Sequence, residues 1–159
     1  MYRLTLELFS LIIIAAAQSS EPCPSQAFVY SPQLNKCYLF KPNLMNYEKS
    51  VAICEQNNAT LAYISSEEEL NFLQYNVGPQ NTVIAYIGTY FDIPTKTWMN
   101  VDGTAFNNIF WYPGQPKLLN GQCTGFYSPN DEKKKGGAAT VSCNKKLYPI
   151  CRAEPKKQK

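Results

Sequence analysis

The side chains that enzymes most often use for acid–base and nucleophilic chemistry are sparse in this sequence. None of its 159 residues is a histidine, which excludes histidine bases, serine–histidine or cysteine–histidine nucleophiles, and histidine metal ligands. A pair of carboxylates, as in glycosidases, is the common hydrolytic scheme that remains. Asp92, Asp102 and Asp131 are candidates, but Asp102 precedes Gly103 in an ordinary turn pair and no spacing distinguishes the others. We therefore expect no enzyme, with a secreted glycosidase as the alternative.

Three consecutive glutamates, Glu67 to Glu69, form the densest acidic cluster. Such a cluster could be catalytic or could bind a metal. However, Ser65 and Ser66 each have a glutamate three residues on, which is the capping box of a helix start. Acidic residues also favour the positive end of the helix dipole. We interpret the cluster as the start of a helix whose inward face carries Leu70 and Leu73.

The first 17 residues have the pattern of a secretory signal peptide. Arg3 supplies a positive start, residues 8–17 are apolar except for Ser10, and Ala15 and Ala17 fit the positions before a cleavage site. The apolar run is about half the ~20 residues that a spanning helix needs. No second run of spanning length follows. We expect residues 1–17 to be a signal peptide and the mature chain to be secreted and extracellular, without a membrane span.

The cysteine content fits that oxidising compartment. An even number without any Cys-x-x-Cys pair indicates a disulfide framework rather than a zinc site. The sequence alone leaves fifteen pairings open. The six residues are Cys23, Cys37, Cys54, Cys123, Cys143 and Cys151. Asn58-Ala59-Thr60 is the sole N-glycosylation sequon and predicts a sugar on Asn58, at a surface turn.

The formal charge of +3 lies mostly in the C-terminal tail. Residues 153–159 carry three lysines against Glu154, a net +2, which leaves about +1 for the rest. A nucleic-acid binder should have a basic folded face, so we predict no nucleic-acid partner. We expect one domain over residues 18–152 and a basic, solvated tail over residues 153–159.

The hydrophobic pattern places helices early and strands late. Residues 28–30 and 37–40 form a predicted hairpin. Tyr47, Val51 and Cys54 follow with helical spacing, and Asn46 is placed to cap that helix. Residues 61–64 are a short buried run.

The second half of the chain is predicted to be β-rich with an irregular middle. Residues 82–88 indicate a strand, and residues 105–125 have little regular period. Residues 139–143 and 147–151 are expected to pair as the closing strands.

Taken in order, these motifs resemble the C-type lectin-like domain family over residues 23–152. The pieces that carry the resemblance are Cys23 to Cys37 followed by Tyr-Leu-Phe, Tyr47 seven residues before Cys54, the segment Asn58 to Ile64, Tyr86-Ile87-Gly88 where the family usually has Trp-Ile-Gly, Trp98 with Val101-Asp102-Gly103, Trp111-Tyr112-Pro113-Gly114-Gln115-Pro116, Cys123, Val141-Ser142-Cys143 and Ile150-Cys151-Arg152. The resemblance implies an α+β fold with two helices, two small antiparallel sheets and a long loop. It also implies the bridges Cys23–Cys37, Cys54–Cys151 and Cys123–Cys143.

Sugar-binding members of the family hold calcium in the long loop with carboxylate and amide oxygens. Here the first ligand motif is Gln115-Pro116-Lys117, which places an ammonium where an oxygen ligand is usual. Gly121 and Gln122 precede Cys123 without a carboxylate. Ala139 and Thr140 stand in the usual Asn-Asp positions, and Ala138 replaces the neighbouring tryptophan. The resemblance therefore implies no calcium at the sugar site and no other cofactor or metal.

We accordingly predict calcium-independent binding of a glycan or protein ligand, with a calcium-dependent lectin as the alternative. Trp98 and Trp111 are expected in the core, and Lys133 to Lys135 in a solvated loop. The family's secreted invertebrate members imply a role in defence, that is, innate immunity. The candidate contacts in the long loop are Tyr112, Gln115, Lys117, Asn120 and Gln122.

Overall fold

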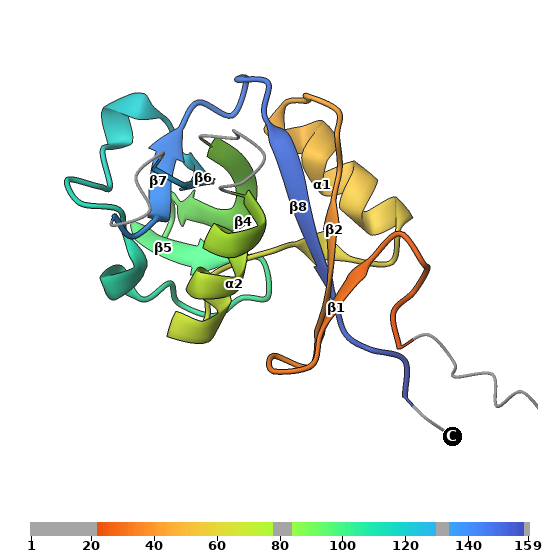
Figure 1. The fold of residues 1–159 in the computed structure, drawn as a ribbon. Coiled ribbons are helices and arrows are strands. Elements are labelled where there is room, and N and C mark those ends of the chain that lie inside the picture. The colour runs from red at the N-terminus through yellow and green to blue at the C-terminus, as the bar shows by residue number, and fades with distance from the viewer. Residues whose placement is uncertain (1–21, 78–83, 130–133, 158–159) are drawn as a thin grey trace, which may run out of the picture.

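The computed structural model describes residues 22–77, 84–129 and 134–157. Two α-helices and a curved, mixed sheet form the framework of this part of the chain (Figure 1). The α-helices are α1 (Tyr47–Gln56) and α2 (Glu67–Val77), and two short 3-10 helices are η2 (Asn108–Phe110) and η3 (Leu118–Asn120). The strands are β1 (Val29–Ser31), β2 (Lys36–Phe40), β3 (Thr60–Leu61), β4 (Ile84–Asp92), β5 (Thr97–Asn100), β6 (Cys123–Tyr127), β7 (Gly137–Val141) and β8 (Tyr148–Ala153).

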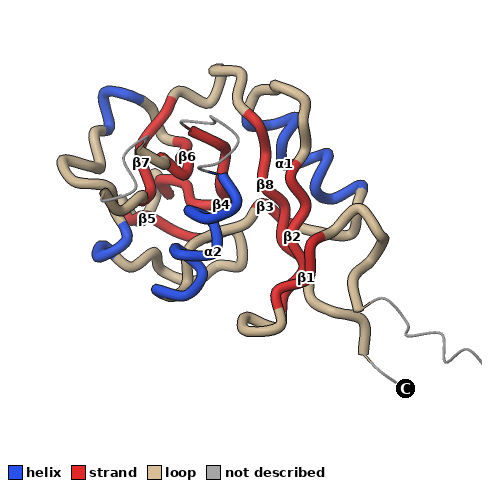
Figure 2. Tube along the Cα trace, in the orientation of Figure 1, coloured by secondary structure: helices blue, strands red, loops and turns tan. Residues whose placement is uncertain are grey.

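The strands form two antiparallel groups that meet at β8. In one group β8 pairs with β2 and β3, and β1 pairs with β2, as the predicted hairpin requires. In the other group β4 pairs with β5 and β6, and β6 pairs with β7. A short parallel pairing of Ala85 and Tyr86 with Tyr148 and Pro149 joins the groups. The two expected antiparallel sheets are therefore continuous (Figure 2).

The prediction that the last two strands pair with each other is wrong. β7 pairs with β6, with Cys123 opposite Val141, and lies at the edge of its group. β8 instead belongs to the other group, where it pairs with β2, and its short parallel pairing with β4 joins the two groups. The disulfide Cys123–Cys143 fixes the end of β7 beside β6, and the chain then crosses to β8. Hydrophobic alternation identifies a strand but does not choose its partner.

The helix starts follow the capping chemistry predicted from the sequence. The Asn46 side chain accepts from the Lys49 backbone N–H at 3.0 Å. The Ser66 hydroxyl accepts from the Glu69 N–H at 3.2 Å, and the Glu69 carboxylate accepts from the Ser65 N–H at 3.0 Å. The capping box is therefore shared by both serines. Leu70 and Leu73 are buried on the inward face of α2.

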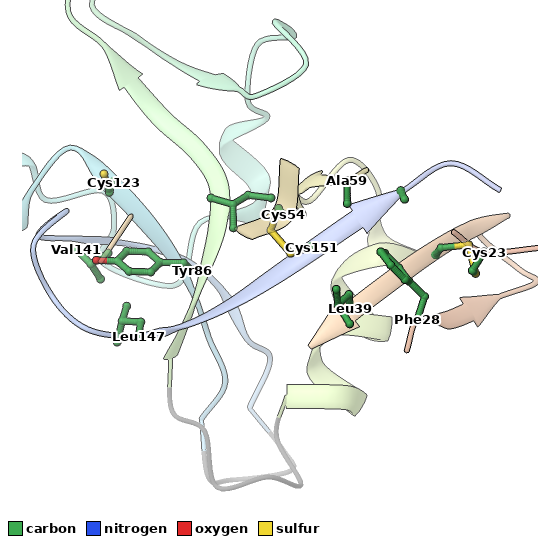
Figure 3. Packing of buried hydrophobic residues seen from close by; sticks show 13 residues of the cluster. Cys23, Phe28, Leu39, Cys54, Ala59, Tyr86, Cys123, Val141, Leu147 and Cys151 are labelled. Carbon is green, nitrogen blue, oxygen red and sulfur yellow. A yellow bond between two sulfur atoms is a disulfide. The ribbon is translucent and has the colours of Figure 1, made fainter. Parts of the chain in front are cut away.

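All three implied disulfides are present. Cys23–Cys37 closes the hairpin, Cys54–Cys151 ties α1 to β8, and Cys123–Cys143 links β6 to the segment after β7. Cys54–Cys151 spans 97 positions, a closure worth about 4–5 kcal/mol in the chain-entropy model. Figure 3 shows this bridge between the helix and β8, in a buried cluster that also contains Leu39 and Tyr86.

The first residues of the predicted tail are in contact with the fold. β8 continues through Ala153, Glu154 pairs with Lys36 at 2.6 Å, and the Lys156 N–H donates to the Pro22 carbonyl. The start of the tail thus packs against residues near Cys23. The predicted signal peptide lies outside the described residues. Within the described ranges, no helix is long and apolar enough to cross a membrane.

Candidate functional site

The long loop that follows η2 runs along the exposed edge of β7. Trp111 forms an isolated parallel bridge with Ala138, and the Tyr112 N–H donates to the Ala138 carbonyl at 2.8 Å. Farther on, Gly121 lies directly against the Val141 carbonyl. The loop therefore covers the backbone groups of an edge strand, which would otherwise be free to pair with another chain.

Thr140, on β7, holds the middle of this loop. The Gln115 side-chain oxygen accepts from the Thr140 hydroxyl at 2.8 Å and from the Thr140 N–H at 3.2 Å. The Lys117 N–H donates to the same hydroxyl at 3.0 Å, and the Lys117 carbonyl lies 2.9 Å from it. A hydroxyl has one proton, so it donates to either Gln115 or Lys117 while it accepts from Lys117. The loop is thus held by protein–protein hydrogen bonds.

The residues present do not fit the calcium ion that the resemblance places here. The one remaining candidate ligand, the Gln115 oxygen, already accepts twice from Thr140. Lys117 is exposed and cationic, and the sequence holds no Asp or Glu from residue 103 to 130. Hard cations such as calcium need several such oxygens. In the described ranges no group of three His, Cys, Asp or Glu residues could hold a metal ion.

The structure separates the five predicted contact residues into different places. Tyr112 lines a groove beside α2, near η2, whereas Asn120 and Gln122 border a depression near η3. Gln115 and Lys117 lie between these ends, where Thr140 binds them. In Figure 1, η2 (teal) and η3 (cyan) lie at opposite ends of the lobe formed by β4 to β7. The five residues therefore do not form one site.

The groove near η2 has an apolar wall, an aromatic ring and charged rims. Its volume is about 290 Å³. It is lined by Glu67, Leu70, Ile109, Trp111, Tyr112, Pro113, Lys134, Lys135 and Gly136. Lys135 pairs with Glu67 across one rim, so the predicted solvated lysine loop is in part attached to α2; Lys133 lies outside the described residues. A concave, largely apolar pocket with a few polar groups is the usual form of a small-ligand site.

The groove is preformed by two sets of contacts. The Gln74 amide, on α2, donates to the Lys134 carbonyl at 3.0 Å and accepts from the Gly136 N–H at 2.8 Å. On the opposite side, the Tyr112 ring packs edge-on against Tyr127, with centroids 4.5 Å apart. These contacts fix the two walls before any ligand arrives, which lowers the ordering cost of binding.

Both tryptophans are partly buried against the hydrophobic core, in agreement with the prediction. The rings of Trp98 and Trp111 meet edge-on at 4.9 Å, and Phe106 lies 4.9 Å from Trp111. They position the start of the loop, which leaves Tyr112 as the aromatic side chain most suited to contact a ligand.

The described carboxylate candidates for catalysis have structural partners instead. Asp92 accepts from the Thr95 N–H and hydroxyl in a turn. Asp102 accepts from the Tyr63 hydroxyl at 2.6 Å and from Thr104. Burial alone would raise the pKa of Asp102, but the hydrogen bonds from Thr104 and Tyr63 lower it below its ordinary value. Asp131 lies outside the described residues.

A buried polar network between α2 and β8 was missed by the sequence analysis. Arg152 donates to both Glu69 carboxylate oxygens, at 3.0 and 3.1 Å, and to the Tyr63 hydroxyl at 2.8 Å. Tyr38 donates to Glu69 at 2.5 Å. The signal was available, because Glu69 falls on the same helical stripe as Leu73 and Val77. A glutamate on an inward stripe is rarely buried without a paired partner, so it indicates a buried cation nearby.

The chain belongs to the C-type lectin domain family. The family model described as the lectin C-type domain matches residues 43–153. The C-type lectin domain family 2 member D-related protein of Rattus norvegicus is 35% identical over 83 residues, which cover 52% of this chain and 34% of that protein. The chain spans about a third of the length of such curated relatives. Membership of this family identifies the domain as a binding module rather than an enzyme.

Solved structures share the same fold at low sequence identity. The mouse scavenger receptor C-type lectin carbohydrate-recognition domain superimposes with a TM-score of 0.72 at 22% identity, over 86% of this chain and 100% of that one. The Ca2+-independent C-type lectin SPL-2 from Saxidomus purpuratus gives a TM-score of 0.71 at 23% identity, over 82% and 93% of the two chains. The α+β fold predicted from the sequence is thereby confirmed.

Proposed function

We propose that this protein is a secreted, calcium-independent binding module that recognises a glycan or protein ligand through the groove lined by Tyr112. The observation that carries the proposal is the double hydrogen bond from Thr140 to the Gln115 oxygen. Through these bonds, protein groups hold the long loop at the place where sugar-binding members of the family hold a calcium ion. SPL-2 is a Ca2+-independent C-type lectin with this fold, so calcium independence is compatible with the fold.

Three further features support the extracellular part of the proposal. Residues 1–17 have a signal-peptide pattern, and the three disulfides suit an oxidising compartment. Asn58 is exposed in a left-handed turn after α1, with φ of 54°. That turn lies at the opposite end of α1 from Cys143, so a glycan there would leave the long loop free. A role in defence, implied by the family resemblance, belongs to the same proposal.

Calorimetric titration of calcium into the oxidised, chelator-stripped protein tests the metal part. We expect no heat beyond dilution, because the Gln115 oxygen is already occupied and Lys117 repels a cation. Calcium binding that disappears in Gln115→Ala would overturn the proposal. Calcium binding that persists in Gln115→Ala would place the ion elsewhere and leave the loop metal-free, as proposed.

An array of glycans probed in the presence of a chelator tests the ligand site. We expect Tyr112→Ala to reduce binding on the order of tenfold, since aromatic anchors often contribute more than 1 kcal/mol. Tyr112→Phe keeps the ring and should retain most of the binding. Asn120→Ala, at the other end of the loop, is the control and should bind normally. Glycan binding that requires added calcium would refute the proposal.

A further inference from the structure

The far end of the long loop, around η3, exposes two adjacent leucines. Leu119 is fully exposed, with a relative accessibility of 103%, and Leu118 is 51% exposed. They border a shallow, open depression together with Asn120, Gly121, Gln122, Ser142 and Cys143. A single exposed leucine is ordinary, but two neighbours at a loop apex form an apolar contact surface.

The charges around these leucines have one sign. We define the tip as two loops, residues 117–122 and 142–147. Its charged residues are Lys117, Lys145 and Lys146, all exposed. The bias extends beyond the tip, because residues 103–159 hold ten of the fifteen Lys and Arg residues but three of the twelve Asp and Glu residues.

The elements beside the tip do not cancel this charge. The Tyr47 N–H donates to the Cys143 carbonyl, which brings the first turn of α1 close, with Glu48 and Lys49. The Phe91 N–H donates to the Gln122 carbonyl, which brings the β4–β5 turn close, with Asp92 and Lys96. Each neighbouring element therefore adds one acid and one base. The net charge of the tip and its neighbouring elements is therefore that of the three lysines of the tip.

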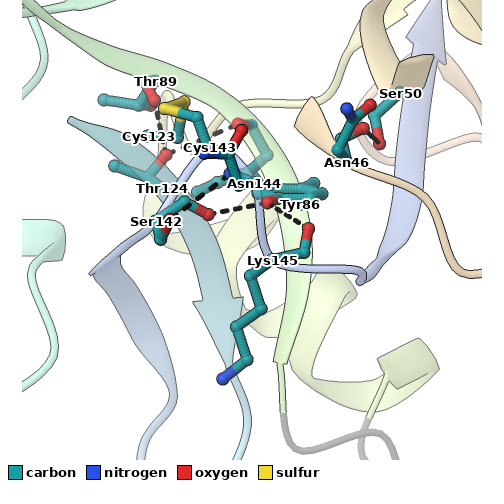
Figure 4. The surroundings of a disulfide bond; sticks show 11 residues. Asn46, Ser50, Tyr86, Thr89, Cys123, Thr124, Ser142, Cys143, Asn144 and Lys145 are labelled. Atoms are coloured by element: carbon teal, nitrogen blue, oxygen red, sulfur yellow. Dashed lines mark hydrogen bonds between the residues drawn. A yellow bond between two sulfur atoms is a disulfide. The ribbon is translucent and has the colours of Figure 1, made fainter. Parts of the chain in front are cut away.

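The two loops of the tip are held rigidly together. The disulfide Cys123–Cys143 joins their bases. The hydroxyl of Tyr86, from the buried face of β4, lies 2.8 Å from the Ser142 carbonyl oxygen and 2.6 Å from the Lys145 carbonyl oxygen, which share its one proton (Figure 4). Thr140 fixes the backbone of Lys117 on the other side. The leucines and lysines thus keep their relative positions without a ligand.

We propose that this tip docks on the surface of an anionic phospholipid bilayer. Leu118 and Leu119 would enter the boundary between headgroups and acyl chains, while the lysines contact phosphate groups. Exposed apolar side chains beside cationic ones are the combination that favours an interfacial position on anionic membranes. This inference is independent of ligand recognition by the groove near η2, which lies at the opposite end of the loop.

Co-sedimentation of the oxidised mature protein with lipid vesicles, in the presence of a chelator, tests the proposal. One vesicle is phosphatidylcholine alone, and the other contains phosphatidylserine as well. We expect binding to the second, lost as salt rises. Leu118→Ser with Leu119→Ser should reduce that binding on the order of tenfold or more, because the apolar burial is lost. Lys145→Gln with Lys146→Gln should reduce it by a similar factor.

Two matched controls separate the tip from general surface effects. Tyr75→Ser removes another exposed apolar side chain, 79% accessible on α2, and should bind vesicles normally. Lys156→Gln with Lys157→Gln removes two tail charges and should have a smaller effect than the Lys145 and Lys146 pair.

Several results would overturn the proposal. These are no binding to phosphatidylserine vesicles, equal binding to neutral vesicles, or full binding by the leucine variant. A leucine-dependent dimer in analytical ultracentrifugation without vesicle binding would assign the tip to a second copy instead. The vesicles carry no glycan, so failure here leaves the groove proposal standing, and failure on the glycan array leaves this one standing.

Discussion

Gly121 shows how a single residue fixes the long loop against β7. Its φ of 135° is in a region that side chains rarely adopt. A Cβ at this position would lie 2.1 Å from the Val141 carbonyl oxygen and 2.7 Å from the Ser142 Cα. Because both neighbours are backbone atoms, they cannot give way as a flexible side chain would. Glycine is therefore required here both for its conformation and for the close approach of the loop to the strand.

We predict that Gly121→Ala lowers the free energy of unfolding by more than about 2 kcal/mol, the combined effect of strain and displaced backbone. Gly114, in the same loop, is the matched control. Its φ is 81°, but a Cβ there meets nothing within 4 Å, so Gly114→Ala should cost about 1 kcal/mol from backbone strain alone. Urea unfolding of both variants measures the difference. Equal losses would show that contact with Val141 is not what constrains Gly121.

At the scale of elements, the Glu69–Arg152 pair connects α2 to β8. The Glu69 carboxylate also accepts from Tyr38 and from the Ser65 N–H and hydroxyl. Arg152 packs over the Tyr63 ring, with its guanidinium carbon 4.0 Å from the centroid. Glu69 is 1% exposed and Arg152 is 9% exposed, so removal of either charge leaves the other in a low-dielectric interior.

We predict that Glu69→Gln destabilises the fold by about 3–5 kcal/mol, because Arg152 then lacks a buried counter-charge. Glu154→Gln is the control. It removes a pair with Lys36 that also involves the end of β8, but Glu154 is 68% exposed, and exposed pairs are worth about 0–1 kcal/mol. Guanidinium unfolding of the two variants compares them. A loss below about 1 kcal/mol in Glu69→Gln would contradict the assigned role.

Features that depend on residues close together in the sequence could be predicted, whereas features that depend on distant residues could not. Asn46 and Ser66 predict helix starts, because a cap is a contact between near neighbours in the sequence. The partner of β7 and the division of the predicted contact residues depend on contacts between distant residues. Gln115 meets Thr140 across 25 positions, and no periodicity reports such a contact. The ordered family motifs supplied the disulfide pairing, which spacing alone had left open.

In the molecule as a whole, buried tyrosines make the stability of the fold depend on pH in the alkaline range. Burial raises the pKa of Tyr86 to about 12, and burial together with the hydrogen bond to Asp102 raises the pKa of Tyr63 to about 12. Burial also raises the pKa values of Tyr38 and Tyr47. These residues come from β2, α1, the segment between β3 and α2, and β4. These tyrosines lie in or beside both hydrophobic clusters. Their ionisation therefore lowers the free energy of unfolding of the whole fold.

The sign of the pH dependence follows from these raised values. Tyrosine in the unfolded chain has a pKa of about 10, so above that pH the unfolded state loses protons that the folded state retains. We predict that the contribution of these tyrosines to the free energy of unfolding is complete below pH 10 and is lost steadily between about pH 10 and 12.

Tyr86→Phe removes one such proton and should reduce the slope of unfolding free energy against pH, although it also loses the bonds to Ser142 and Lys145. Denaturant unfolding of the parent protein and the variant across this pH range, with tyrosinate absorbance recorded in parallel, measures the two slopes. A flat profile, or phenol ionisation complete before unfolding, would show that these hydroxyls are accessible to solvent in the folded protein.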